Sequence, residues 1–202
     1  ACPSCIDNQW LLPFEKFSSD PDALEVEADQ SEITEKDNYL ITGNVKLRSD
    51  EHYLSADQVL LSKEDQSSKA TGSVKYQDNH FFLTGEVLNV KKENDGLIVD
   101  LSNARYQEIE TKANGSAKFI LKTPNNAFLE ESRYSMCPIN DNTWYIKAKT
   151  INFNLNTNRV VADKATFVFF DFPIFYLPKY SWVAKGRGSG FLTPSFNIYK
   201  ES

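Results

Sequence analysis

The sequence lacks long hydrophobic runs, lacks an excess of basic residues and has few histidines. Its most apolar stretch, residues 167–178, is interrupted by Asp171, Pro173 and Pro178, whereas a membrane-spanning helix needs about 20 consecutive apolar residues. The net charge is -6, so most of the surface would repel phosphate groups, and we predict no nucleic-acid partner because phosphate binding needs a basic face. The first residues contain neither the basic segment nor the apolar core of a signal peptide, so we interpret the chain as a mature protein or part of one.

Histidine occurs only twice, as His52 and His80, and both lie beside apparent turns. The acidic residues are scattered over expected loops and outward strand faces, so no set of nucleophile, base and acid is recognisable. We therefore predict that the protein is not an enzyme and has no catalytic residue, no metal site and no cofactor.

Cysteine occurs three times, as Cys2, Cys5 and Cys137. Cys2 and Cys5 form a C-x-x-C pair, which suits zinc binding, dithiol redox chemistry or a disulfide. A zinc site needs two further ligands, which Cys137 with His52 or His80 could supply, although none has the usual paired spacing. Redox chemistry is disfavoured because no helix is expected to follow the pair. Since the number is odd, at least one cysteine in an oxidising compartment stays free or pairs outside this chain.

Apolar and polar residues alternate through most of the chain, which is the period of a half-buried β-strand. Turn-rich segments separate the alternating runs, and no amphipathic helix is recognisable. About ten or eleven short strands without crossover helices predict an antiparallel sandwich, jelly roll or barrel. The alternating runs lie at residues 24–28, 39–47, 70–76, 81–87, 97–101, 113–121, 144–148, 151–155 and 165–169.

Two short motifs recur along these runs. Thr-Gly-Asn-Val-Lys at 42–46 returns as Thr-Gly-Ser-Val-Lys at 71–75, and related sequences occupy 84–87 and 114–118. Leu-Ser-Ala-Asp-Gln-Val at 54–59 resembles Val-Val-Ala-Asp-Lys-Ala at 160–165. Repetition of short strand units predicts stacked rungs. Glycine and alanine share a face with bulky apolar residues, which is explained either by a slot for an elongated apolar ligand or by ordinary bulges in a filled core.

The character of the sequence changes from Pro173 onward. A closing strand is expected first, then a glycine-rich hinge at 185–190, then the start of another sheet at 191–199, so we expect the chain to continue into a partner domain. We predict three parts: a cysteine-bearing segment at 1–22, a β-domain at 23–180, and a hinge with the start of a further domain at 181–202.

Three stretches together resemble a known family. The first comprises Val-Glu-Ala-Asp at 26–29, Thr-Gly-Asn-Val at 42–45 and the motif at 54–59. The second is Tyr-Ser-Met-Cys-Pro at 134–138 with Trp144 downstream, and the third runs from Pro173 to Pro178 and on to residues 189–194. In this order they resemble the N-terminal domain of the outer-membrane lipopolysaccharide-assembly family (LptD, OstA/Imp), whose jelly roll is shared with the periplasmic bridge proteins LptA and LptC.

The resemblance implies an all-β, antiparallel β-jelly roll with an apolar interior groove, whose C-terminal end leads into the first strand of an outer-membrane β-barrel absent from this chain. It also implies that Cys137 and one N-terminal cysteine form disulfides with cysteines near the end of that barrel. We favour Cys5 over Cys2 because it lies nearer the folded domain. The lipid-groove candidates are Val45, Leu47, Val74, Leu83, Val87, Phe119, Leu121, Phe153, Phe167 and Phe169.

The same resemblance implies lipopolysaccharide transport and assembly at the outer membrane. The domain would lie in the periplasm, receive lipopolysaccharide from LptA by edge-strand pairing, shield its acyl chains and pass it to the barrel, which would also bind the lipoprotein LptE. A free-standing periplasmic bridge protein of the same fold is the alternative, and a carbohydrate-binding jelly roll is disfavoured because no aromatic platform is recognisable.

Overall fold

The computed structural model describes residues 23–34, 38–93, 96–139 and 141–184. The predicted cysteine-bearing segment at 1–22 and the hinge from residue 185 lie outside the described residues. The strands are β1 (Glu25–Glu27), β2 (Gln30–Ile33), β3 (Tyr39–Arg48), β4 (Tyr53–Ser62), β5 (Ser67–Gln77), β6 (Phe81–Glu93), β7 (Gly96–Glu108), β8 (Asn114–Lys122), β9 (Asn126–Ser135), β10 (Trp144–Asn154), β11 (Arg159–Phe169) and β12 (Phe172–Val183).

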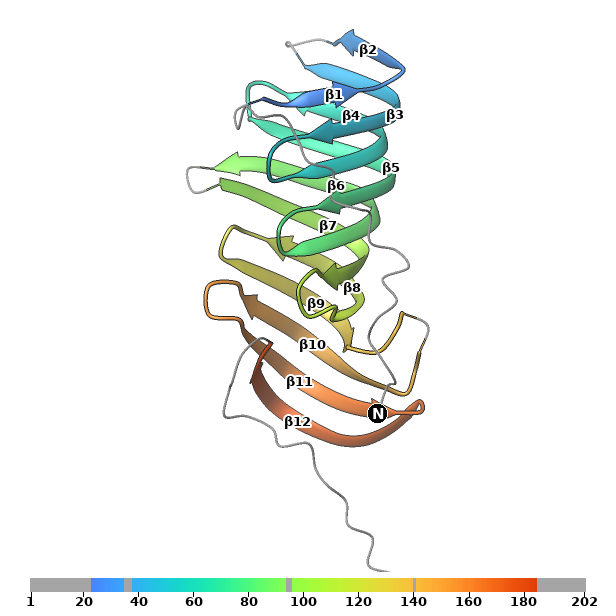
Figure 1. Ribbon diagram of the computed structural model, residues 1–202, viewed down its shortest axis with the longest axis vertical. Coiled ribbons are helices and arrows are strands. Elements are labelled where there is room, and N and C mark those ends of the chain that lie inside the picture. Colours follow the sequence, from blue (N-terminus) through green and yellow to red (C-terminus); the bar gives the residue numbers. More distant parts are fainter. Residues whose placement is uncertain (1–22, 35–37, 94–95, 140, 185–202) are drawn as a thin grey trace, which may run out of the picture.

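All twelve strands belong to one antiparallel sheet, and from β3 to β12 each strand pairs with the next along the chain. The strands are therefore stacked in sequence order from one end of the molecule to the other (Figure 1). β1 and β2 both pair with β3, along its two halves, and together form the rung at the N-terminal end. β12 forms the rung at the other end.

Each long strand changes direction near its middle. In five strands, β3, β5, β7, β9 and β11, one non-glycine residue there has a positive φ, between 44° and 52°: Asn44, Ser73, Asn103, Glu131 and Lys164. The strand register shifts by one residue at the corner beside Asn44 and Ser73, as in a β-bulge, which bends a strand and increases its twist. At Asn103, Glu131 and Lys164 the register continues without a shift, and the positive φ alone turns the strand. Because these bends lie side by side, they fold the whole sheet along one line, which we call the corner.

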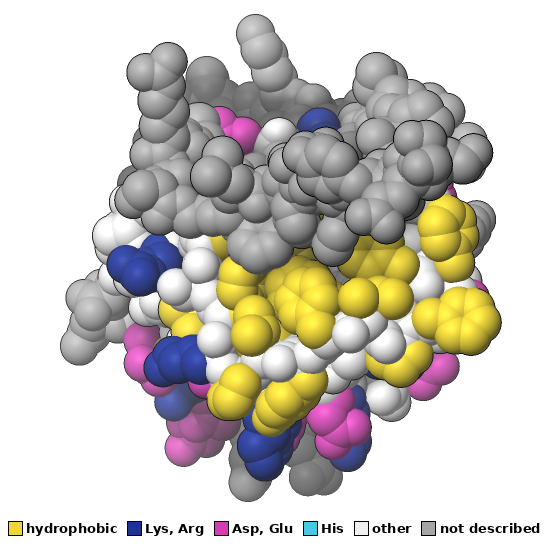
Figure 2. All heavy atoms as spheres, turned by 90° about the horizontal axis from the view of Figure 1, so that it is seen from below, with side chains coloured by type: hydrophobic (Ala, Val, Ile, Leu, Met, Phe, Trp, Pro, Cys, Tyr) yellow, Lys and Arg dark blue, Asp and Glu magenta, His cyan; other side chains and the backbone are white. Residues whose placement is uncertain are grey.

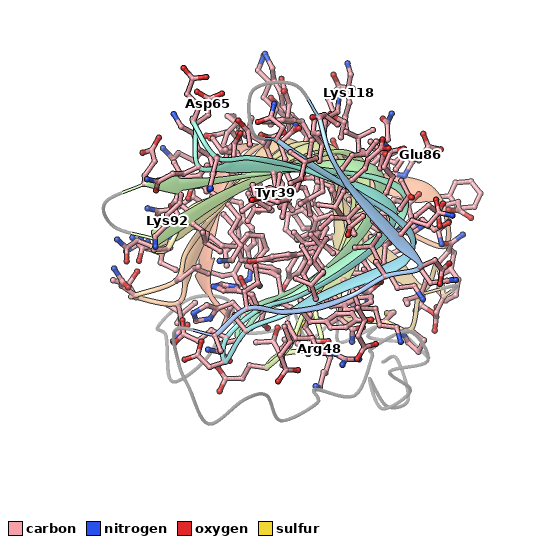
Figure 3. All side chains as sticks on the ribbon, turned by 90° about the horizontal axis from the view of Figure 1, so that it is seen from above. Tyr39, Arg48, Asp65, Glu86, Lys92 and Lys118 are labelled. Carbon is pink, nitrogen blue, oxygen red and sulfur yellow. The ribbon has the colours of Figure 1, made fainter. Side chains whose placement is uncertain are left out.

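The corner divides every long strand into two halves that face each other across the core. The β3–β4, β5–β6, β7–β8, β9–β10 and β11–β12 turns lie along one border of the folded sheet, which we call the first rim. The remaining turns lie along the second rim. Viewed along the stack, the two layers enclose a space filled with side chains, while Asp65, Glu86, Lys92 and Lys118 point outward (Figure 3).

Aromatic contacts hold the two halves together. Phe81, Tyr106 and Tyr134 come from the first-rim halves of β6, β7 and β9, and the ring of Phe153 from the second-rim half of β10 lies 5.5, 6.3 and 6.3 Å from their ring centres. Trp182, from the second-rim half of β12, packs on Tyr134 at 5.1 Å. One core of buried side chains therefore extends from Ile41 to Phe167.

The predicted antiparallel, all-β jelly roll is confirmed, with an apolar interior between the folded halves. Helices are not found in the described residues, and the part of the chain that the structure describes contains no helix that could span a membrane. β9 was not among the alternating runs, because its buried residues Leu129 and Ser132 are three positions apart at the corner. β12 extends to Val183, three residues beyond the domain end predicted at 180.

The Thr-Gly repeats mark the corner in β3 and β5. Gly43 and Gly72 have φ values of 79° and 76°. A Cβ atom added to Gly43 would collide with the carboxylate of Asp29, and one added to Gly72 would collide with the carboxylate of Asp57. The same arrangement thus occurs twice: the aspartate of an Ala-Asp pair on one rung lies against the glycine of the next rung.

We predict that Gly72→Ala destabilises the domain by about 1–3 kcal/mol, because alanine there is strained by the positive φ and collides with Asp57. The matched control is Ser73→Gly, at the next residue, where φ is already 45°. This change removes strain at a cost in chain entropy of about 0.5–1 kcal/mol, so its net effect is expected to be close to zero. Urea unfolding of both variants checks this, and equal losses would contradict it.

Candidate functional site

The interior between the folded halves is where the apolar candidates were expected. Six of the ten are buried and belong to the core. They are Val45, Leu47, Val74, Leu83, Phe153 and Phe167. The structure therefore brings candidates from β3, β5, β6, β10 and β11 into one apolar interior.

The other four candidates, Val87, Phe119, Leu121 and Phe169, lie elsewhere. Leu88 and Ile120, not Val87 and Phe119, are buried in the core, while Leu121 is only half-buried and Phe169 is 41% exposed. For Val87, Phe119 and Leu121, strict alternation was wrong because the corner shifts the phase of the strand. On β8, for example, the buried residues are Asn114, Ala117, Ile120 and Lys122, so Phe119 and Leu121 project from the outer face. Phe169 follows a separate register shift between Phe167 and Val168, at the end of β11.

A signal for this shift is present in the sequence. A small residue followed three positions later by an apolar one marks the corner in several strands, where alternation alone would give a spacing of two. Such pairs of buried residues are Ala56 and Val59, Ala117 and Ile120, Ala148 and Ile151, and Ala162 and Ala165.

The interior is packed with side chains along most of its length. A small cavity remains between the halves, too tight to hold even a water molecule, and is lined by Phe81, Leu83, Tyr106, Ile120, Lys122, Ala127 and Leu129. Its lining is apolar apart from Lys122 and the hydroxyl group of Tyr106. In this closed arrangement the interior has no room for a ligand, so an acyl chain can enter only if the two halves separate.

Lys122 makes the most deeply buried ion pair among the described residues. Its Nζ lies 2.6 Å from Oδ2 of Asp78, and the two side chains are 6% and 4% exposed. Lys122 ends β8 at the second rim, whereas Asp78 lies in the β5–β6 turn at the first rim. The pair therefore joins the two rims beside the cavity. Sequence reasoning missed both residues, because a polar turn and a strand-ending lysine normally lie in solvent.

Further polar groups surround Asp78 on the first rim. Its Oδ1 accepts hydrogen bonds from the backbone N–H groups of His80 and Phe81, both at 2.8 Å. The Tyr76 hydroxyl lies 3.4 Å from Asp78 Oδ2 and 3.0 Å from His52 Nδ1. Burial raises the pKa of Tyr76 well above its ordinary value, with Asp78 adding to the effect, and burial lowers the pKa of His52. These bonds fix Asp78 independently of Lys122.

The two ends of the sheet have different edges. β1 and β2 are exposed along their whole length, with Val26 47% and Ile33 69% exposed. Glu27 holds β1 on the sheet through Arg48 at 2.6 Å and Lys46 at 3.4 Å, and the hydrogen bond from Arg48 lowers the pKa of Glu27. β12 contains Pro173 and Pro178, which lack an N–H donor and so interrupt edge pairing.

The β12 end also presents exposed apolar side chains (Figure 2). Phe170 and Asp171 form the β11–β12 turn with φ of 47° and 64°. The exposed apolar residues of this region are Phe169, Phe170, Phe172, Ile174, Tyr176 and Val183.

Cys137 is fully buried and disulfide-bonded. Its carbonyl accepts a hydrogen bond from Asn114 at 2.8 Å, and its N–H donates to Ser135. Cys2 and Cys5 lie outside the described residues, and the expected pairing with cysteines beyond this chain stays a prediction. His52 and His80 are on neighbouring turns of the first rim, and within the described ranges no three His, Cys, Asp or Glu side chains are grouped as metal ligands.

Comparison with known proteins gives a consistent result. Residues 25–159 match the family model described as LptA/(LptD N-terminal domain) LPS transport protein. The LPS-assembly protein LptD of Idiomarina loihiensis is 25% identical over 178 residues, and that of Nitrosococcus oceani is 30% identical over 174 residues. These alignments cover 88% and 85% of this chain but 23% of each relative. The chain thus spans about a quarter of the length of these relatives.

Among solved structures, the chain is similar to LptH, described as the LptA homologous periplasmic component of the lipopolysaccharide transport device of Pseudomonas aeruginosa. The sequence identity is 18%, the TM-score is 0.30, and the match covers 72% of this chain and 89% of LptH.

Which side chains of β8 face the core can be tested by truncating two neighbouring residues. We predict that Ile120→Ala, in the core, costs about 2–5 kcal/mol of unfolding free energy. Phe119→Ala, on the outer face, should cost only about 1 kcal/mol, although it removes more atoms. Chemical denaturation measures both values. A larger loss of unfolding free energy for Phe119→Ala would mean that Phe119, as strict alternation predicts, faces the core.

Proposed function

The chain belongs to the LptA and LptD N-terminal domain family of lipopolysaccharide transport proteins, and we propose that this domain carries lipopolysaccharide by shielding its acyl chains between the two halves of the folded sheet. An acyl chain of a dozen carbons costs about 10 kcal/mol to expose to water, at roughly 0.8 kcal/mol per methylene. Continuous shielding is therefore required, and the apolar interior from Ile41 to Phe167 offers it.

One observation carries the proposal. The halves are held together across the core by side-chain contacts such as Phe81–Phe153 and Tyr134–Trp182, whereas the backbone hydrogen bonds run between neighbouring strands within each half. The halves can therefore separate, by bending at the corner, without breaking the sheet. A core that opens in this way replaces its own side-chain contacts with contacts to lipid, which have a similar apolar character.

The chemistry required is binding and release, so the domain needs no catalytic group and we propose that it is not an enzyme. In the whole protein it would lie in the periplasm and pass lipid to an outer-membrane barrel, with which LptE would associate. Directional transfer requires that the domain bind lipid no more tightly than the next carrier does.

We further propose that the bridge protein LptA docks on the β1–β2 edge. An added strand needs free backbone donors and acceptors along an exposed edge. β1 and β2 are exposed and contain no proline, whereas β12 contains two. Docking at β1–β2 would place the interiors of the two proteins end to end.

The lipid path is tested with a photo-crosslinking amino acid at Leu83, in cells that produce the full-length protein. Leu83 is 1% exposed and lines the cavity, so lipopolysaccharide adducts are expected there. Leu121, on the outer face, is the matched control and should give none. Adducts at neither site, with the protein correctly assembled, would contradict the proposal.

The docking edge is tested by placing the same photo-crosslinker at two exposed isoleucines, one on each edge strand. Ile33 on β2 and Ile174 on β12 are 69% and 56% exposed. We expect adducts with LptA at Ile33 alone. Adducts at Ile174 instead would mean that LptA docks at β12, which would contradict the proposed docking edge.

A further inference from the structure

Lys122 and Asp78 are the buried charged residues of the described part of the chain. They are not neighbours in the sheet: Lys122 pairs with Val99 on β7 and Ala127 on β9, while Asp78 lies in the turn between β5 and β6. Their 2.6 Å contact joins the two rims. Because Lys122 also lines the cavity, the ion pair lies beside the cavity at the place where the two rims meet.

The two partners are held very differently. Asp78 is fixed to the first rim by two backbone N–H groups at 2.8 Å, and these bonds do not depend on Lys122. Lys122 reaches it with a long, flexible side chain from the second rim. A lysine can keep its methylenes on apolar surface while its ammonium group moves into water. Separation of the rims therefore leaves Asp78 in its turn and moves Lys122.

The chemistry of the pair favours a contact that opens. Two apolar side chains at this place would hold the rims more firmly, since replacing a buried ion pair by apolar residues is often neutral or stabilising. An ion pair behaves differently when the rims part, because each charged group regains its hydration. Separating the rims therefore costs less free energy when they are joined by an ion pair than when they are joined by two apolar side chains.

We propose that Lys122 and Asp78 form a releasable clasp between the rims, and that this clasp controls entry of acyl chains into the interior from the side. The inference rests on the proposed lipid-carrying function and adds the place at which the folded sheet opens. Leu83 and Ile120, which line the cavity beside Lys122, are the first apolar core side chains that a chain would meet after the clasp releases.

The test uses Asp78→Asn, which removes the charge but keeps an oxygen that can accept the two backbone hydrogen bonds. Lys122 then remains without its counter-charge, and the closed rims are weakened. Asp78→Asn combined with Lys122→Met removes both charges and should restore the contact between the rims. Lys118→Met is the matched control, because Lys118 lies on the same strand but pairs with Glu131 at an exposed site, where the side chains are 64% and 59% exposed.

Two measurements are made on the 202-residue chain. Hydrogen exchange of the backbone amides at 78–81 and 120–126, without lipid, reports opening of the rims. A photo-crosslinker at Leu83 with purified lipopolysaccharide reports entry. We expect Asp78→Asn to increase both rates several-fold, the double variant to return them to or below those of the unchanged chain, and Lys118→Met to alter neither.

Equal exchange and equal adduct rates in the unchanged chain, Asp78→Asn and the double variant would overturn the clasp while leaving the lipid path intact. Faster exchange in Asp78→Asn without adducts in any variant would instead overturn the lipid-carrying function and, with it, the role of the clasp in entry. Failure of the double variant to reverse the effects of Asp78→Asn would assign them to damage in the turn and would also overturn the clasp.

Discussion

The bend at the middle of each strand is the constraint on which the rest of the structure depends. A twelve-stranded sheet with apolar residues on one face has no second layer to pack against, so it must cover that face with itself. The bends do this by placing residues such as Asn44, Ser73 and Asn103 at positive φ. At these residues the strand changes direction, and the nearest inward-facing positions on its two sides are more than two residues apart. Glycine at Gly43 and Gly72 leaves room for the carboxylates of the preceding rung. The corner therefore determines where the core, the two rims and the cavity between the halves lie.

A domain folded in this way combines a stable sheet with an interior that can open. The strand-to-strand hydrogen bonds run along the stack and the apolar contacts run across it, so the two are broken by different motions. Where the halves meet, aromatic packing around Phe153 supplies cohesion, and the Lys122–Asp78 pair supplies a polar contact at the rims. The ends of the stack differ as well, with an open edge at β1–β2 and an edge interrupted by prolines at β12. This polarity suits a domain that receives its cargo at one end and passes it on at the other.

Sequence alone predicted the fold class, the rungs and most of the interior, because alternation and the Thr-Gly and Ala-Asp repeats are local signals. The prediction of inward-facing residues failed where a bend in the middle of a strand changes which side chains face the core. Extending one phase through β8 placed Phe119 inside and Ile120 outside, although the spacing of three from Ala117 to Ile120 indicates a bend. The clasp could not be predicted in the same way, since 44 positions separate Asp78 from Lys122 and only the folded sheet brings them together. Edge exposure likewise depends on topology, which alternation does not specify.

The central claim is that the two halves separate to admit lipid, and the distance between the rims tests it most directly. Spin labels carried by non-natural amino acids would report this distance in the absence and presence of lipopolysaccharide. They are placed at Asn79 on the first rim, next to Asp78, and at Asn125 on the second rim, three residues after Lys122. A shift of the distance distribution to longer values on lipid binding is the predicted result. An unchanged distribution, under conditions where lipopolysaccharide is bound, would contradict the account.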